Sequence, residues 1–185
     1  MKLVIASDIH GSALFAKQLM DRVSAEQADR LVLLGDLLYH GPRNPLPPGY
    51  HPTEVAAMLN ASPVPVVAVR GNCEAEVDQT LLDFPCMDTT AQIIDGNRTL
   101  MFSHGHVVSP ENHPALPSPA ALFTGHTHKK ILEGRKGVWY VNPGSVSLPK
   151  DGIRSYATYE DGVFALKQLK DGEVLVQAIM TDLEA

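Results

Sequence analysis

The sequence predicts an α/β fold, a four-layer α/β/β/α sandwich in which two sheets pack face to face with helices outside them. In the first half of the chain, short apolar runs alternate with helical patterns, which is typical of parallel strands joined by crossover helices. In the second half, Asp-Gly pairs that favour tight hairpins separate the apolar runs, at Asp95, Asp151, Asp161 and Asp171. The length of 185 residues, 44% of them hydrophobic, fits one domain over residues 1–185.

The first half predicts three buried parallel strands and two helices. A helix is expected after Ser12, a plausible N-cap residue, and a second helix over Thr53–Leu59. The strands are predicted over Lys2–Ala6, Leu31–Leu34 and Val64–Val69. Ligands of such sheets bind at the carboxyl ends of the strands, so the residues that follow these runs are candidates for function.

The second half predicts a mostly antiparallel arrangement of short strands. These are expected over Gln92–Asp95, Thr99–Ser103, Ala121–Thr124, Ile131–Glu133, Val138–Asn142, Tyr156–Tyr159, Val163–Leu169 and Val174–Met180. Nine of the 14 prolines lie in two segments, Pro42–Pro52 and Pro110–Pro119. Both segments follow candidate ligands, so we expect ordered loops at the rim of a site; that they instead pack together or form a subunit contact is equally open.

The composition disfavours several classes of function. The formal net charge is -6, with 15 basic against 21 acidic residues, which argues against binding to long nucleic acid or to an anionic membrane. The apolar run before Asp8 is too short for a signal peptide or a membrane span, so we expect a soluble cytoplasmic protein. The two cysteines, Cys73 and Cys86, form no CxxC motif and are expected to stay reduced.

Oxygen and imidazole ligands follow five different predicted strands. Any one of them alone is an ordinary turn or surface residue, but their common position after apolar runs favours a metal site. Carboxylate and imidazole suit Mn, Fe, Zn or Ni, and seven ligands exceed the need of one ion, so two ions sharing one carboxylate are expected. The seven are Asp8, His10, Asp36, Asn72, His104, His126 and His128.

The ordered series Asp8-x-His10, Gly35-Asp36, Gly71-Asn72, His104 and Gly125-His126-x-His128 resembles the calcineurin-like metallophosphoesterase superfamily. The segments SDIHGS, LGDLLYHGPRN, VRGNCE, SHGH, GHTH and NPGSVSLPK look like the small bacterial YfcE-like phosphodiesterases of that superfamily. The resemblance covers essentially the whole chain and implies the metallophosphoesterase type of sandwich. It further implies that Asp8, His10, Asp36 and His128 hold one metal and that Asn72, His104, His126 and the shared Asp36 hold the other. The implied metal is Mn²⁺, which the spacing does not separate from Fe, Ni or Zn.

A pair of divalent ions roughly 3.5–4 Å apart clamps a phosphate and lowers the pKa of a bridging water, which then attacks in line as hydroxide. The predicted activity is therefore hydrolysis of a small phosphodiester without a protein nucleophile. Arg43, in the loop after Asp36, is a candidate to bind phosphate oxygens, and a plain surface role for it is equally open. The resemblance implies that Asn72 also polarises a phosphate oxygen.

Cys73 departs from the superfamily pattern. Many members have a histidine directly after the Gly-Asn ligand, as a proton donor to the leaving group, and a neutral thiol is a poor substitute. We therefore expect weak acid assistance and a preference for leaving groups that need little protonation. His106 is a candidate replacement for the missing acid, with a supporting role at the rim as its alternative.

A second function remains open, because this fold also serves as a metal-binding, non-catalytic scaffold for protein interaction in retromer-type subunits. The seven intact ligand positions favour the enzyme. The substrate is open among cyclic nucleotides, other nucleotide diesters and lipid headgroup diesters. Small members of this type often self-associate, so a homo-oligomer is open as well.

Overall fold

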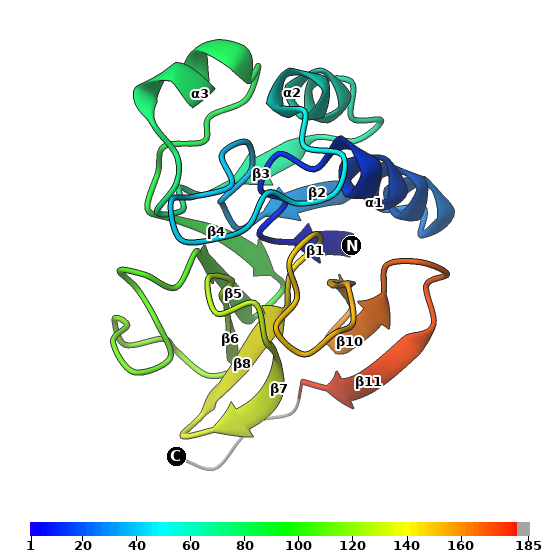
Figure 1. Ribbon diagram of the computed structural model, residues 1–185. Helices are drawn as coiled ribbons and strands as arrows, with labels where there is room; N and C mark the ends of the chain where they lie inside the picture. Colours follow the sequence, from blue (N-terminus) through cyan, green and yellow to red (C-terminus); the bar gives the residue numbers. More distant parts are fainter. Residues whose placement is uncertain (181–185) are drawn as a thin grey trace.

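The computed structural model describes residues 1–180, which form two sheets and three helices (Figure 1). The strands of the first sheet lie in the order β11-β10-β9-β1-β2-β3, and those of the second in the order β4-β5-β6-β8-β7. In Figure 1 the helices lie together above the first sheet, with the second sheet below it. The predicted two-sheet α/β sandwich is confirmed.

The parallel part of the first sheet contains β1 (Lys2–Ala6), β2 (Arg30–Leu33) and β3 (Val66–Ala68). The crossovers contain α1 (Ala13–Ala25) and α2 (Pro52–Asn60), close to the predicted helices. Ser12 caps α1 as expected, since its side chain accepts a hydrogen bond from the Phe15 amide. The sequence pattern missed α3 (Glu76–Leu81), which is only six residues long and too short to show a helical period.

The remaining strands match the predicted apolar runs. They are β4 (Thr90–Asp95), β5 (Arg98–Ser103), β6 (Ala120–Phe123), β7 (Lys130–Arg135), β8 (Val138–Pro143), β9 (Ser155–Glu160), β10 (Val163–Gln168) and β11 (Val174–Ile179). Most of their pairings are antiparallel, but β5, β6 and β8 pair in parallel. The Asp-Gly pairs at Asp95, Asp161 and Asp171 form hairpin turns. The pair at Asp151 does not, because it lies in the loop before β9, where the Asp151 carboxylate pairs with Lys130.

Apolar side chains between the two sheets form the core that fixes their relative position. Phe102 and Phe123 stack there with ring centroids 4.9 Å apart, and both side chains are fully buried. A second core lies between the helices and the first sheet, and Phe15 and Leu19 of α1 belong to it together with Leu31 and Leu33 of β2. Burial on both faces explains why the parallel strands are continuous apolar runs.

The outer face of the second sheet is covered by a loop rather than by a helix. Val108 and Leu116, in the long connection between β5 and β6, pack against Met101, Leu122 and Tyr140. In the second proline-rich segment, Pro110–Pro119, Leu116 thus shields an apolar sheet face, and no residue of this segment lines the cavity described below. The first proline-rich segment does reach the rim, because Pro42 lines the cavity described below.

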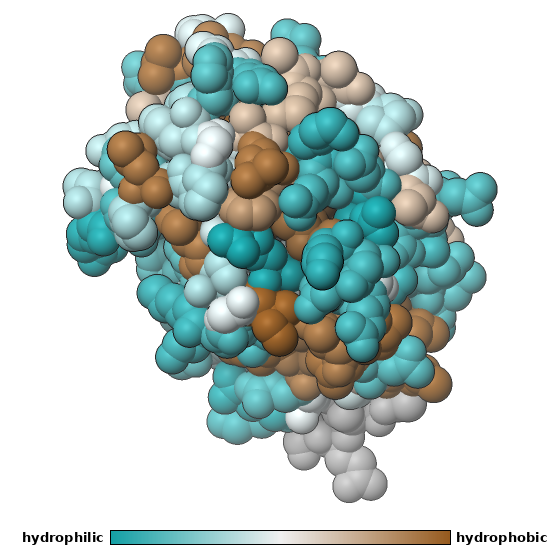
Figure 2. Space-filling model, turned by 45° about the vertical axis from the view of Figure 1, so that its right-hand side comes forward, coloured by the Kyte–Doolittle hydropathy of each residue, from teal (hydrophilic) through white to brown (hydrophobic). Residues whose placement is uncertain are grey.

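Apolar side chains also remain exposed along the edge strand β11, at Val174, Val176 and Ile179. Figure 2 shows hydrophobic surface in the lower part of the molecule, on the side where β10 and β11 lie in Figure 1. Within residues 1–180, no helix is long and apolar enough to cross a membrane.

Candidate metal centre

The seven predicted ligands lie together on loops that follow β1, β2, β3, β5 and β6. Both sheets contribute, because β1 to β3 belong to the first sheet and β5 and β6 to the second. Most of these side chains are buried, whereas His126 is half-buried and Asn72 is exposed. The common edge is the one at which parallel strands present their carboxyl ends.

The first group of ligands surrounds one oxygen of Asp8. Asp8 Oδ1 lies 3.2 Å from His128 Nε2 and 3.5 Å from His10 Nε2, and the two Nε2 atoms are 3.2 Å apart. The carboxylate of Asp36 is close to the same place, with Oδ2 3.7 Å from His10 Nε2. Asp8, His10 and His128 therefore offer ligand atoms that could hold one cation.

The second group surrounds the imidazole of His104. His104 Nε2 lies 3.5 Å from Asp36 Oδ1, 3.2 Å from Asn72 Oδ1 and 3.2 Å from His126 Nδ1. Asp36 therefore lies between the two groups, with one carboxylate oxygen toward each. This is the arrangement that a shared carboxylate requires.

Backbone carbonyls fix the tautomers of three histidines. The Nδ1 atoms of His10, His104 and His128 lie 3.0, 2.7 and 2.7 Å from the carbonyl oxygens of Tyr39, Leu34 and Leu148. Because a carbonyl oxygen only accepts, each Nδ1 is the donor, and a neutral ring then directs the Nε2 lone pair into the cluster. Such orientation of ligands by outer hydrogen bonds is typical of metal sites.

The cluster thus brings histidine nitrogen lone pairs and carboxylate oxygens together, with no hydrogen-bond donor between them. Asp8 Oδ1 is fully buried and has no hydrogen-bond partner among residues 1–180, although the other oxygen of this carboxylate accepts from the His126 amide at 3.0 Å. An unpaired buried carboxylate oxygen that faces two imidazole lone pairs is unfavourable unless a cation lies among them. These donors therefore fit a divalent metal ion.

The pKa shifts of Asp8 and His10 also indicate that the cluster stabilises a positive charge. Burial alone would raise the pKa of Asp8, but the nearby imidazoles of His10 and His128 outweigh burial and hold this pKa well below its usual range. Burial alone would lower the pKa of His10, but the contact with Asp8 outweighs burial and raises it. Both shifts favour a positive charge next to the buried carboxylates.

The backbone of the ligand loops is strained in a consistent way. Asp8, His10, Asp36, His126 and His128 have φ values between 50° and 65°, which L-residues adopt uncommonly and Asp and His more readily than most. Close approach adds a second constraint, because a Cβ atom on Gly71 would lie 2.5 Å from the Asp36 amide nitrogen. Backbone strain of this kind is characteristic of functional sites.

Sequence reasoning missed the residues that hold the ligand loops in place. Glu74 is 4% exposed, and its carboxylate accepts hydrogen bonds from the amides of Asp36, Leu37 and Gly71. It therefore ties the loop after β2 to the loop after β3. Its position three residues after Gly71, in the GNCE segment, was the only signal in the sequence.

Ser145 and Ser147, in the loop after β8, have a similar role. Their hydroxyls donate to the backbone carbonyl of Asp8 at 2.8 and 3.1 Å. Both are fully buried and come from the NPGSVSLPK segment, in which neither was singled out. The turn that carries Asp8 is thus fixed from the second sheet.

A cavity of about 1100 Å³ opens beside the cluster. Two of the residues whose roles were predicted from the sequence, Arg43 and His106, line it together with Cys73. Lys129 and Lys150 also line this cavity and were not predicted. Asp36, Asn72, His126 and His128 form the part of its wall that belongs to the ligand cluster.

The environment of this cavity shifts three further pKa values. Burial, then the charge of Asp36, raises the pKa of the Cys73 thiol, which keeps it protonated and unreactive at neutral pH. Burial and the neighbouring His104 lower the pKa of His106, and the same two causes lower the pKa of His126. Neutral rings are therefore favoured at both positions.

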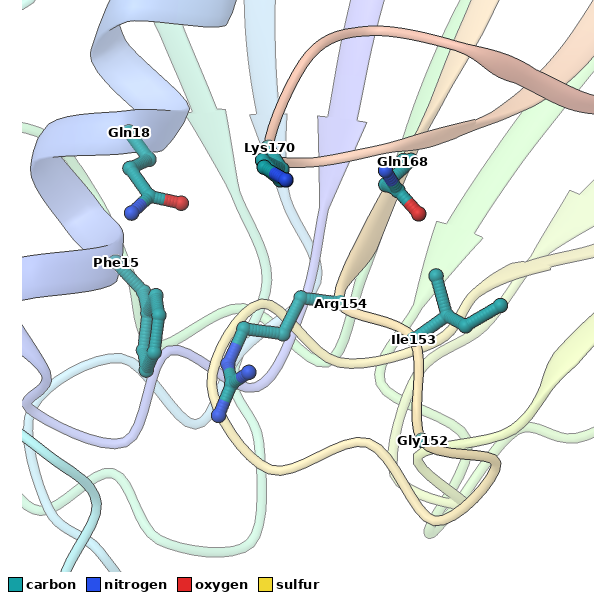
Figure 3. A pocket seen from close by; sticks show the side chains of 7 residues that line it. All are labelled: Phe15, Gln18, Gly152, Ile153, Arg154, Gln168 and Lys170. Atoms are coloured by element: carbon teal, nitrogen blue, oxygen red, sulfur yellow. The ribbon is translucent and has the colours of Figure 1, made fainter.

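A smaller cavity of about 370 Å³ lies between α1 and the loop before β9 (Figure 3). The guanidinium of Arg154 lies over the ring of Phe15, 3.9 Å from its centroid. Figure 3 shows Gln18, Gln168 and Lys170 around the same space. None of the seven predicted ligands lines it, so it is separate from the metal centre.

Comparison with known proteins shows the family to which the chain belongs. Residues 1–161 match the model of the calcineurin-like phosphoesterase superfamily domain. The chain belongs to this family. The resemblance expected from the ligand series is confirmed, and so is the prediction of a phosphoesterase enzyme of this family.

The chain is similar to a curated protein and to solved structures over nearly its whole length. The chain is 44% identical over 178 residues to the phosphodiesterase YfcE of Escherichia coli K12, which covers 96% of this chain and 97% of that protein. A solved structure of the E. coli phosphoesterase YfcE has a TM-score of 0.94 at 43% identity and covers 98% of this chain and 100% of that chain. The zinc complex of Vps29 from Entamoeba histolytica shares the fold, with a TM-score of 0.64 at 20% identity over 98% of this chain and 100% of that chain.

Proposed function

We propose that this protein is a metal-dependent phosphodiesterase that hydrolyses a small phosphodiester. The observation that carries the proposal is the unpartnered, fully buried Asp8 Oδ1, which faces the imidazoles of His10 and His128 at the edge of a phosphoesterase fold. The name of the relative at 44% identity, a phosphodiesterase, supports the diester as the class of substrate.

The proposed ligand sets follow the two groups in the cluster. Asp8, His10, Asp36 and His128 would hold one ion, and Asn72, His104, His126 and Asp36 the other. The position of Asp36 between the groups supports its role as the shared ligand. The all-N,O donor set suits Mn²⁺, our proposed metal, as well as Fe, Ni and Zn.

When bound, two divalent ions supply the Lewis acid for the phosphate and the activation of the attacking water. The protein's own residues do the rest. Asn72 would polarise a phosphate oxygen, and Arg43 would bind one from the rim of the cavity, which both residues line. Glu74 and the two serines keep Asp36 and Asp8 in place, so that the donors do not reorganise when substrate binds.

Proton transfer to the leaving group is the weak part of this site. Cys73 holds its proton, since burial and Asp36 raise its pKa, and a thiol is a poor hydrogen-bond donor. His106 lines the cavity but favours the neutral form, so its contribution is a hydrogen bond to the ester rather than a proton at neutral pH. We therefore propose that good leaving groups are hydrolysed fastest.

The alternative function is a scaffold for protein interaction. The likeness to Vps29 at 20% identity concerns the fold alone, so it does not favour this alternative. The complete set of seven ligand side chains in the cluster favours the enzyme. A cytoplasmic location and self-association stay predictions, the second of which light scattering of the purified protein tests directly.

Hydrolysis of bis(p-nitrophenyl) phosphate tests the proposed function. Purified protein is stripped with a chelator and then titrated with Mn²⁺, and turnover is expected only with the metal. Asp8→Asn should abolish turnover and weaken metal binding, whereas Asp21→Asn, a change of an exposed carboxylate on α1, should alter neither. Tight Mn²⁺ binding without hydrolysis of this or any other phosphodiester would instead support the scaffold.

A further inference from the structure

Two lysines in the wall of the active-site cavity have no role in the chemistry proposed so far. Lys129 directly follows the ligand His128, and Lys150 lies in the loop between β8 and β9. The Lys150 amide donates to the His128 carbonyl at 3.0 Å, which brings the two lysines to the same side of the cavity. Both side chains are exposed to the cavity and solvent.

A third lysine nearby, Lys130, is neutralised by a carboxylate, whereas Lys129 and Lys150 are not. Lys130 Nζ pairs with the Asp151 carboxylate at 2.6 Å and donates to the Ile153 carbonyl at 3.1 Å. Lys129 and Lys150 adjoin this pair in sequence, yet neither forms an ion pair within the part of the chain that the structure describes. The Asp151 carboxylate, next to Lys150 in the sequence, is thus used to hold Lys130, and the two unpaired lysine charges line the cavity.

The charge of the site exceeds what a simple diester supplies. The carboxylates of Asp8 and Asp36 lie in the ligand cluster, and Glu74 is buried against backbone amides, so none of them neutralises a lysine. Two divalent ions would carry four positive charges against these three carboxylates, which leaves one positive charge. That charge and Arg43 already exceed the single negative charge of a simple phosphodiester, so the lysines then remain without an anionic partner.

We propose that Lys129 and Lys150 bind a second anionic group of the substrate, so that the preferred diester has a phosphate on one of its arms. This inference rests on the proposed phosphodiesterase function and narrows its substrate class. The cavity of about 1100 Å³ has room for a substituted arm beside the scissile phosphate. Lysine suits this role, because its compact charge binds phosphate without a fixed geometry.

A matched pair of substrates tests the proposal. One is 4-nitrophenyl 2-methoxyethyl phosphate, which has no internal nucleophile, and the other has the methoxy group replaced by a phosphate group. For the wild type, the KM of the methoxy substrate should exceed that of the phosphate substrate by about tenfold, the sum expected from two partly exposed charge pairs. In the double variant Lys129→Gln/Lys150→Gln the ratio of the two KM values should fall close to one, with kcat for the phosphate substrate retained.

Lys17→Gln, a change of an exposed lysine on α1, is the control and should keep the wild-type ratio. High salt should reduce the ratio in the wild type, since the charges are solvent-accessible. A wild-type ratio near one, or a ratio that the double variant leaves intact, would overturn the proposal.

Failure of the proposed function gives a different result, namely no metal-dependent hydrolysis of either substrate or of bis(p-nitrophenyl) phosphate. Calorimetric titration with the corresponding phosphonate diesters, which are not cleaved, then still measures the preference for the charged arm. Equal dissociation constants for the two phosphonates would refute the role of the lysines independently of turnover.

Discussion

A methyl group added at Gly71 should displace Asp36, the proposed shared ligand, without a change in any functional side chain. The Cβ atom of Gly71→Ala would lie 2.5 Å from the Asp36 amide nitrogen and 2.7 Å from Glu74 Oε2, and closer still to Asp36 Oδ1. Ordinary van der Waals contact begins at 3.4 Å. The Asp36 backbone must therefore move by about 0.9 Å, the difference between 3.4 and 2.5 Å.

The expected effect on catalysis is large and the effect on stability moderate. A displacement of about 1 Å at a positioned group can cost on the order of 10²-fold in rate, so kcat for bis(p-nitrophenyl) phosphate should fall about 100-fold. Crowding of this kind destabilises a folded protein by about 1–3 kcal/mol, which urea unfolding measures. The apparent dissociation constant for Mn²⁺ should rise in parallel, because Asp36 is assigned to both ions.

Gly96→Ala is the matched control. Gly96 has a φ of 62°, but nothing lies within 4 Å of the position that an added Cβ atom would take, so this variant tests backbone strain without crowding. Its kcat and Mn²⁺ affinity should equal those of the wild type. If Gly71→Ala also keeps the wild-type kcat and metal affinity, the close packing of the ligand loops does not position Asp36, and the reasoning is wrong.

Three further predictions concern single side chains. Asp36→Asn should lower kcat by at least about 10³-fold and reduce the Mn²⁺ stoichiometry measured by elemental analysis, whereas a substantial residual rate would contradict the shared ligand. Wild type should cleave aryl phosphodiesters faster than alkyl diesters of similar size, and Cys73→His should raise the alkyl rate by about tenfold or more, with Cys73→Ser as the control; equal aryl and alkyl rates would refute weak acid assistance. Away from the site, Glu26 accepts hydrogen bonds from Lys167 and Tyr156, each at 2.7 Å, and although burial opposes its charge these contacts lower its pKa. Its ionised form therefore stabilises the fold at neutral pH, and this stabilisation is lost as the pH falls through the lowered pKa. Glu26→Gln should cost about 2 kcal/mol in urea unfolding at pH 7, with a gap from the wild type that narrows in acid and that a pH-independent gap would contradict.

The sequence predicted the fold and the ligand cluster for the same physical reason. Parallel strands buried on both faces are apolar runs with sharp ends, and polar side chains directly after those ends, such as His10 and His104, must meet at one edge of the sheets. The pattern could not reveal which groups hold the ligands in place. Glu74 acts on backbone amides of two other loops, and such contacts depend on tertiary approach rather than on spacing.

Dependence on tertiary contacts also explains why the roles of the loop around Leu116 and of the two cavity lysines were not predicted. The segment around Leu116 was expected at the rim because it follows His104, but its apolar side chain covers an outer sheet face that the sequence alone does not show to be uncovered. The cavity role of Lys129 and Lys150 depends on which carboxylates are already paired. That pairing follows from the contact between Lys130 and Asp151, which lie 21 residues apart in the sequence.

The division of the ligands between the two sheets has a mechanical consequence. Each proposed ion takes ligands from the loops of β1 to β3 on one side and from those of β5 and β6 on the other. Each would thus be a cross-link between the two halves of the sandwich, next to the apolar core that already joins them. The melting temperature should therefore rise as the metal concentration rises. Hydrogen exchange of the amides at this edge should slow, because the bound ions restrain the opening of the two sheets.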